Sequence, residues 1–214
     1  MADKRLTPEL LLTAYASGIF PMAEARDDPD VYWVDPRVRG VLPLDGFHVS
    51  RSLARRLRRD DYVVRMDTDI SAVLDACADR PDTWINGTIR ALVTALFERG
   101  FAHTTEVWAD NRLIGGVYGI ALGGAFFGES MFSRERDGSK IALTWLVDHL
   151  HRVGFTLFDT QFMTPHLGSL GALEIARDDY RERLAEALET PARINAISLE
   201  TDRQALVQRM TQTS

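Results

Sequence analysis

The sequence predicts an α+β fold, and three observations support this prediction. The chain has 214 residues, which is enough for one large domain with a smaller one attached. Hydrophobic residues make up 45% of it and aromatic residues 9%, so the chain can bury a substantial core and is not intrinsically disordered. Its apolar pattern also changes along the chain, from helical spacing to alternating strands and then to a helix and a further strand.

Charge and cysteine content exclude several classes of protein. Lys and Arg number 25 against 31 Asp and Glu, a net charge of −6, so any basic surface must be local. The single cysteine, Cys77, excludes a disulfide framework and a multi-cysteine metal site. The N-terminal stretch lacks the pattern of a signal peptide, and the longest uncharged stretch, residues 113–128, is too short for a membrane helix. We therefore expect a soluble, cytoplasmic protein without membrane contact.

The first half of the chain is expected to be mainly helical. Thr7 followed by Pro8 marks a helix start, and this helix should end at Gly18. Residues 19–43 carry four prolines and are expected to be irregular, although their aromatic residues favour packing against the rest of the protein. Further elements are then predicted in this order: a helix at 50–59, a strand at 62–66, and helices at 70–77 and 89–100.

The second half has the pattern of an antiparallel meander. Alternating residues predict three strands separated by tight turns, at 104–108, 113–122 and 125–132. A helix at 140–153, capped by residues 137–139, and an apolar strand at 155–162 follow. A last helix should cover about 177–188.

This order of elements is similar to the acyltransferase core of the GNAT superfamily. We expect a small N-terminal domain at 1–45 and a GNAT-like catalytic domain at 46–190. The polar C-terminal tail at 191–214 is either helical or loose.

Polar residues interrupt two of the apolar strands. Strand alternation places Glu129 on one face with Phe127 and Met131, opposite Phe126. A carboxylate among apolar residues needs a partner, so Glu129 is either a ligand for a substrate hydroxyl or amine, or half of an ion pair.

Asp159 and Gln161 are two residues apart and therefore point to one face of their strand. They either form a pocket wall, with the carboxylate orienting a neighbouring group, or belong to a buried hydrogen-bond network.

A dense group of arginines stands out in this acidic chain: Arg51, Arg55, Arg56, Arg58 and Arg59. Arg51, Arg55 and Arg58 share one face of the predicted helix. The group either contacts the phosphate backbone of a nucleic acid or is a solvated basic helix paired with the two aspartates that follow.

Other motifs argue against particular ligands. In GNAT enzymes a glycine-rich loop binds the pyrophosphate of coenzyme A, but residues 133–140 contain one glycine and two acids, which disfavours acetyl-CoA as donor. The five histidines are scattered and no metal or nucleotide motif occurs, so no metal and no cofactor are expected. Cys77 lies on an apolar helix face, as a buried inert thiol does.

Several short motifs together resemble one family. In chain order they are YxxGIFP from Tyr15, DPR from Asp35, HVSRS from His48, TWI from Thr83, GGVYG from Gly115, GESMFSR from Gly128 and DxQFxxxHLxSLGA from Asp159. The set covers residues 7–184 and is similar to the leucyl/phenylalanyl-tRNA–protein transferase family. Two departures are Met22, where some members have Trp, and the run at Tyr32, which is one residue shorter.

The resemblance implies an aminoacyltransferase of the leucyltransferase type. It would move leucine or phenylalanine, and also methionine, to the N-terminal amine of proteins that begin with Lys or Arg, marking them for N-degron proteolysis. Its partners would be Leu-tRNA, Phe-tRNA and those proteins. The reaction is aminolysis of an activated ester, which needs no cofactor and can draw much of its rate from positioning.

The resemblance also implies residue roles. Gln161 would hold the attacking amine, and Asp159 would polarise Gln161. Trp84 would stack on adenine, with Met22 as a softer second partner. The pocket for the aminoacyl group and the terminal adenosine would be lined by Val117, Phe126, Glu129 and Leu146. The arginines at 51–59 would contact tRNA phosphates. A non-catalytic tRNA- or peptide-binding module is the alternative, since it would not need Asp159 and Gln161.

Overall fold

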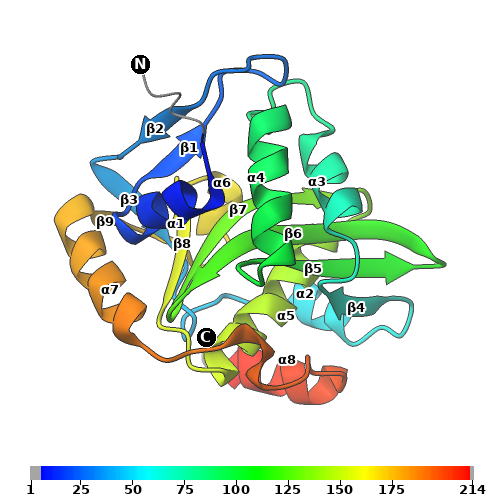
Figure 1. The fold of residues 1–214 in the computed structure, drawn as a ribbon. Coiled ribbons are helices and arrows are strands. Elements are labelled where there is room, and N and C mark those ends of the chain that lie inside the picture. The colour runs from blue at the N-terminus through cyan, green and yellow to red at the C-terminus, as the bar shows by residue number, and fades with distance from the viewer. Residues whose placement is uncertain (1–5, 213–214) are drawn as a thin grey trace, which may run out of the picture.

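A seven-stranded mixed sheet runs through the centre of the computed structural model, which describes residues 6–212 (Figure 1). The strands are β1 (Phe20–Met22), β2 (Tyr32–Val34), β3 (Val38–Val41), β4 (Val63–Met66), β5 (Ala102–Ala109), β6 (Arg112–Leu122), β7 (Ala125–Ser133), β8 (Leu157–Gln161) and β9 (Leu173–Ala176). The large sheet has the order β4-β5-β6-β7-β8-β3-β9, and β1 pairs with β2 in a separate sheet. Neighbours in the large sheet are antiparallel except β7 and β8, which are parallel.

Helices cover both faces of this sheet and enclose two hydrophobic cores. The helices are α1 (Pro8–Ala16), α2 (Arg51–Leu57), α3 (Ile70–Ala78), α4 (Gly87–Glu98), α5 (Gly138–Arg152), α6 (Pro165–Gly168), α7 (Arg177–Glu189) and α8 (Arg203–Gln212), with a short 3-10 turn, η1 (Ile194–Ala196), before α8. Residues of α1, α3, α4 and α7 pack on one face, and residues of α2, α5 and α8 pack on the other. Within residues 6–212, no helix has the length and hydrophobicity that a membrane span requires.

The mixed α+β architecture and the β5–β6–β7 meander are confirmed. The side chain of Thr7 accepts the N–H of Leu10, and Pro8 occupies the first turn of α1, as the sequence predicts. The cap expected for α5 differs. Asp137 makes no side-chain capping hydrogen bond, because its backbone is left-handed, with φ at 65°.

The prediction that residues 19–43 are irregular is confirmed for most of this segment, including 23–31, but is wrong for β1, β2 and β3. β3 lies inside the large sheet, where it pairs with β8 and β9. Pro36 and Pro43 flank β3 without interrupting it, so its main-chain N–H groups remain free to pair. β9 and α6, each four residues long, were not predicted.

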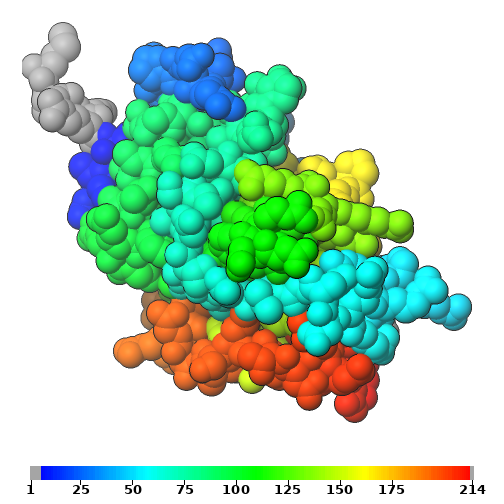
Figure 2. Space-filling view, turned by 90° about the vertical axis from the view of Figure 1, so that its right-hand side faces the viewer, coloured from blue at the N-terminus to red at the C-terminus, as the bar shows by residue number. Residues whose placement is uncertain are grey.

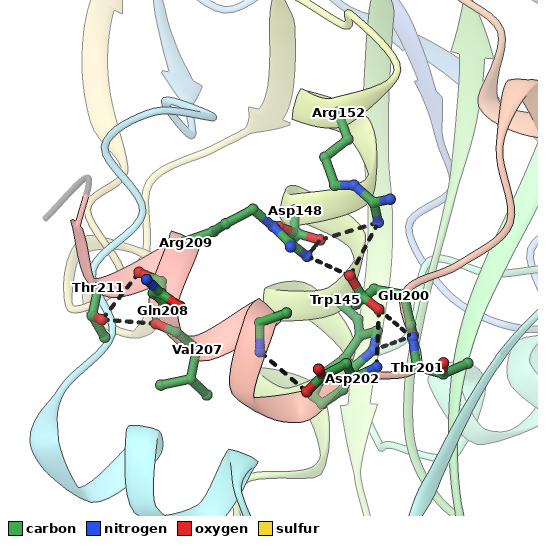
Figure 3. A network of polar contacts seen from close by, with 11 residues as sticks. Trp145, Asp148, Arg152, Glu200, Thr201, Asp202, Val207, Gln208, Arg209 and Thr211 are labelled. Carbon is green, nitrogen blue, oxygen red and sulfur yellow. Dashed lines mark hydrogen bonds and ion pairs between the residues drawn. The ribbon is translucent and has the colours of Figure 1, made fainter.

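The C-terminal segment is helical and belongs to the core. Leu206 and Val207 of α8 are fully buried on the same side of the sheet as α5. Figure 3 shows the polar contacts that fix it there. Arg209 donates to both oxygens of Asp148 on α5, at 2.7 and 2.9 Å, and to Glu200 at 2.9 Å.

α8 also supports the arginine-rich helix α2, which it contacts. In Figure 2 the cyan α2 region lies directly above the orange and red C-terminal segment. Arg58 donates to the side chain of Gln204 at 3.3 Å, and Arg203 lies 3.0 Å from Asp60. The end of the chain therefore holds α2 in place.

Candidate active site

Glu129 lies in a β-bulge of β7. Gly128 and Ser130 pair with adjacent residues of β6, so Glu129 is the extra residue without an opposite partner. The bulge reverses the alternation of side chains along the strand. Phe127 therefore belongs to one hydrophobic core and Met131 packs against the other. The predicted common face for these residues is wrong for this reason.

The side chains of Glu129 and Gln161 meet between β7 and β8. Gln161 Nε2 donates to Glu129 Oε1 at 2.7 Å, and the Tyr15 hydroxyl also hydrogen-bonds to this carboxylate. Burial raises the pKa of Glu129 to about 8, and the two hydrogen bonds oppose part of that rise. Gln161 has a positive φ of 63°, a conformation that side-chain-bearing residues rarely adopt and that recurs at functional sites.

Asp159 lies two residues before Gln161 on β8 and forms an ion pair with Arg39. Two parallel hydrogen bonds join them, from Nε to Oδ1 at 2.9 Å and from Nη2 to Oδ2 at 2.6 Å. The Tyr180 hydroxyl donates to Oδ2 at 2.8 Å, and the Gln161 main-chain N–H donates to Oδ1 at 2.7 Å. Asp159 therefore fixes the backbone of Gln161 and makes no hydrogen bond to its side-chain amide.

Sequence reasoning missed Arg39, Tyr15 and Tyr180. Arg39 is 1% exposed, and its guanidinium lies between the rings of Phe20 and Tyr180, with centroids at 4.6 and 4.4 Å. The sequence does contain one signal for Arg39. A buried Asp requires a cationic or hydrogen-bonding partner, and an arginine within a short apolar run, here between Val38 and Gly40, is a candidate for that partner.

A cavity of about 210 Å³, here called the apolar cavity, opens beside Gln161 and Glu129. Trp84 and Arg80 line it together with Glu129 and Gln161. Its apolar wall is formed by Val117, Met131, Leu143, Phe158, Phe162 and Leu167. Four predicted site residues therefore share one cavity: Trp84, Val117, Glu129 and Gln161.

Three other predicted residues lie outside the wall of this cavity. Phe126 is 1% exposed and packs edge to face on Phe158, with ring centroids 5.1 Å apart. Leu146 is buried in the core, and Leu143, one helical turn earlier on α5, lines the apolar cavity instead. Met22 is half-buried in β1, opposite Tyr32 of β2.

The arginines of 51–59 are divided between two surroundings. Arg55, Arg56 and Arg59 line a groove of about 450 Å³, here called the arginine groove, together with Arg136. Asp61 also lines it and pairs with Arg56 at 2.5 Å and with Arg59 at 3.1 Å. Arg51 and Arg58 do not line the groove. Arg51 is exposed to solvent, and Arg58 donates to Gln204 of α8.

A third cavity, of about 320 Å³, lies between the other two and is here called the linking cavity. It shares Met131 with the apolar cavity and Asp137 with the arginine groove. The three hollows therefore adjoin one another, from α2 to the Gln161 amide.

An amide held in place beside an apolar cavity, with an arginine-lined groove further along the same surface, is compatible with a transferase that takes a small apolar group from an anionic carrier. Comparison with known families agrees. A model described as leucyl/phenylalanyl-tRNA protein transferase matches residues 41–185, and a model for its N-terminal domain matches residues 4–37.

The chain belongs to the leucyl/phenylalanyl-tRNA protein transferase family, as the resemblance in its motifs predicted, and it is an aminoacyltransferase. A relative of that name from Ruegeria sp. (strain TM1040) is 61% identical over 98% of this chain and 99% of its own length. One from Cereibacter sphaeroides (strain ATCC 17023) is 59% identical over the full length of both chains.

Among solved structures, the L-PGS structure from Bacillus licheniformis overlaps 96% of this chain and 75% of its own, at 15% identity. Its TM-score of 0.41 is too low to support an argument about fold.

Proposed function

We propose that this enzyme takes leucine, phenylalanine or methionine from aminoacyl-tRNA and joins it to the N-terminal amine of proteins that begin with Lys or Arg. The observation that carries this proposal is the Gln161–Glu129 hydrogen bond at the edge of the apolar cavity. The product would carry a new N-terminal residue that directs N-degron proteolysis. The reaction would take place in the cytoplasm, where aminoacyl-tRNA is made.

The chemistry is aminolysis of the aminoacyl ester. A C–N bond forms between the acceptor amine and the ester carbonyl, the C–O bond to the ribose breaks, and a proton passes from the amine to the ribose oxygen. Because Gln161 Nε2 is engaged with Glu129, the amide Oε1 is the group left to accept an N–H of the amine. An amide oxygen is too weakly basic to remove that proton. Gln161 therefore acts by orienting the amine, and orientation can supply much of the rate.

Asp159 acts in this proposal through the backbone. Its hydrogen bond to the Gln161 N–H holds the left-handed conformation that directs the side chain toward Glu129. Arg39 occupies both carboxylate oxygens, so Asp159 is a positioning residue and not a proton acceptor.

The walls of the apolar cavity would set donor specificity. They offer aliphatic and aromatic surface to the side chain of the transferred amino acid, while Trp84 offers a ring on which adenine can stack. One methylene more or less in such a pocket changes binding by roughly 1–3 kcal/mol, so selection against valine should be modest.

The adjoining hollows suggest a route for the tRNA. The acceptor stem would contact the arginines of α2, and its single-stranded 3′ end would follow the linking cavity to Gln161. The GNAT-like assignment of the core is part of this proposal, with boundaries wider than the expected 46–190, because β3 lies in the same sheet and α8 packs in the same core. The assignment rests on the order of the meander, α5 and the parallel strand β8.

The direct test compares Gln161→Ala with a matched change at Gln208, an exposed residue of α8. Transfer of labelled leucine from Leu-tRNA should fall by about 100-fold in the first variant, the order expected for lost positioning, and stay unchanged in the second. Both should retain the wild-type circular dichroism spectrum. Equal turnover in the two variants would remove Gln161 from the reaction.

A further inference from the structure

Two basic side chains line the linking cavity without an anionic partner. Lys140 from the first turn of α5 is half-buried and forms no salt bridge with any residue of the described chain. His166 lies on α6, and its Nε2 is buried without a hydrogen-bond partner. Burial lowers the pKa of His166, and the positive charge of Lys140 lowers it further.

Two further polar side chains of the linking cavity, Ser133 and Asp137, already have partners. The Ser133 hydroxyl donates to the carbonyl of Glu135 and accepts the N–H of Ser139. Asp137 is the carboxylate in the wall, and Arg136 lies 3.7 Å from it. Within the described residues, the Lys140 ammonium has no anionic partner and His166 Nε2 has no hydrogen-bond partner, and an anion would satisfy both.

The position of this pair limits which anion it would meet. The linking cavity touches the apolar cavity at Met131 and the arginine groove at Asp137. If the aminoacyl end of a tRNA lies beside Gln161 and its duplex lies on α2, the shortest path for the connecting nucleotides passes this cavity and brings a phosphodiester to it. Met131 and Phe132 add apolar surface against which a base can pack.

We propose that Lys140 and His166 form a phosphate subsite for the single-stranded 3′ end of the donor tRNA. The proposal rests on the function proposed above and adds the residues that hold the strand between helix α2 and the site of transfer. The subsite contacts the backbone without reading a base. A bound phosphate reverses the influence of Lys140 and favours the protonated ring of His166.

The first experiment measures transfer kinetics with two donors, Leu-tRNA and leucyl-adenosine, which lacks phosphate. In Lys140→Gln, the KM for Leu-tRNA rises several-fold with kcat unchanged, while leucyl-adenosine is used as by the wild type. The salt dependence of Leu-tRNA binding becomes shallower by about 0.7, the value for one phosphate contact on a single strand. Lys140→Arg retains the charge and restores most of the affinity.

The matched control is Arg99→Gln, which removes one positive charge from the end of α4, on the other face of the sheet, where Arg99 pairs with Glu9. This variant should keep the wild-type KM for both donors. If Lys140→Gln and Arg99→Gln have the same effect on Leu-tRNA, or if Lys140→Gln impairs leucyl-adenosine equally, there is no phosphate subsite at this cavity.

The second experiment uses the scarcity of lysine in this chain. Lys140 is the only lysine in residues 6–212, and Lys4 provides an internal reference. CpCpA should protect Lys140 from reductive methylation, read by peptide mass spectrometry, whereas adenosine should not; protection by neither contradicts the proposal. A wild-type enzyme that cannot use Leu-tRNA would instead overturn the proposed function.

Discussion

The variant Glu129→Gln should gain stability over the wild type as pH rises. The reason is that the buried Glu129 carboxyl must take up a proton on folding once it is ionised in the unfolded chain, and this costs more free energy at higher pH. In the unfolded state this carboxyl loses its proton near pH 4.5, whereas in the folded protein its pKa is about 8. Below 4.5 both states hold the proton. Between the two values only the unfolded chain releases it, so the stability that the neutral carboxyl contributes at low pH is progressively lost, and above about 8 the loss is complete.

The size of the effect follows from that interval. Each pH unit is worth about 1.4 kcal/mol for one titrating group, which gives an upper value of roughly 5 kcal/mol across the whole range. For a chain of this length, each kcal/mol changes the Tm by about 2–4 °C. The glutamine side chain of the variant would keep an oxygen that can accept from Tyr15 or Gln161 but would have no charge to desolvate.

The assay is urea denaturation of wild type and Glu129→Gln at pH 5, 6, 7, 8 and 9, followed by circular dichroism. The difference in unfolding free energy should grow in favour of the variant from pH 5 to about 8 and then level off. A difference that stays constant over this range would refute the claim that burial holds the Glu129 proton.

Three further predictions concern the scaffold. Burial raises the pKa of Cys77 to about 12. At pH 8 a thiol reagent should therefore leave the native protein unmodified, and one equivalent should react after unfolding. Fast modification of the native protein would contradict this. A Cβ on Gly115 would lie 2.4 Å from the Gly138 carbonyl carbon, so Gly115→Ala should lower the free energy of unfolding by about 1–3 kcal/mol. Gly87→Ala is the control and should not lower it, because a Cβ on Gly87 would have open space around it. Equal urea midpoints for the two variants would show that β6 and α5 can separate freely. Asp148→Asn weakens the contacts to Arg209 and should cost about 2 kcal/mol in the same assay, unless α8 is held by packing alone.

Local patterns in the sequence were sufficient to predict most helices and the meander. The apolar spacing of α4 and the cap at Thr7 are properties of a few consecutive residues, and both are present in the structure. β3 and β9 could not be found in this way. β3 is defined by pairing with strands more than a hundred residues later, and β9 pairs with β3 in turn.

The candidate site shows the same limit. Asp159 and Gln161 were found because polar residues interrupt an apolar strand, but Arg39 lies 120 residues before Asp159 and is joined to it by the sheet. The bulge at Glu129 also could not be predicted, since it depends on the register of β7 against β6. It changes which residues share a face, and it is the reason that Glu129 can reach Gln161 and Tyr15.

The central claim is transfer of an amino acid to a basic N-terminus, and one measurement tests it most directly. Purified enzyme is given labelled Leu-tRNA and a model protein that begins with Arg, in parallel with the same protein beginning with Ala. Label is expected on the Arg protein alone, at its N-terminal amine. Equal label on both proteins would contradict the acceptor rule, and no label on either would contradict the proposed reaction itself.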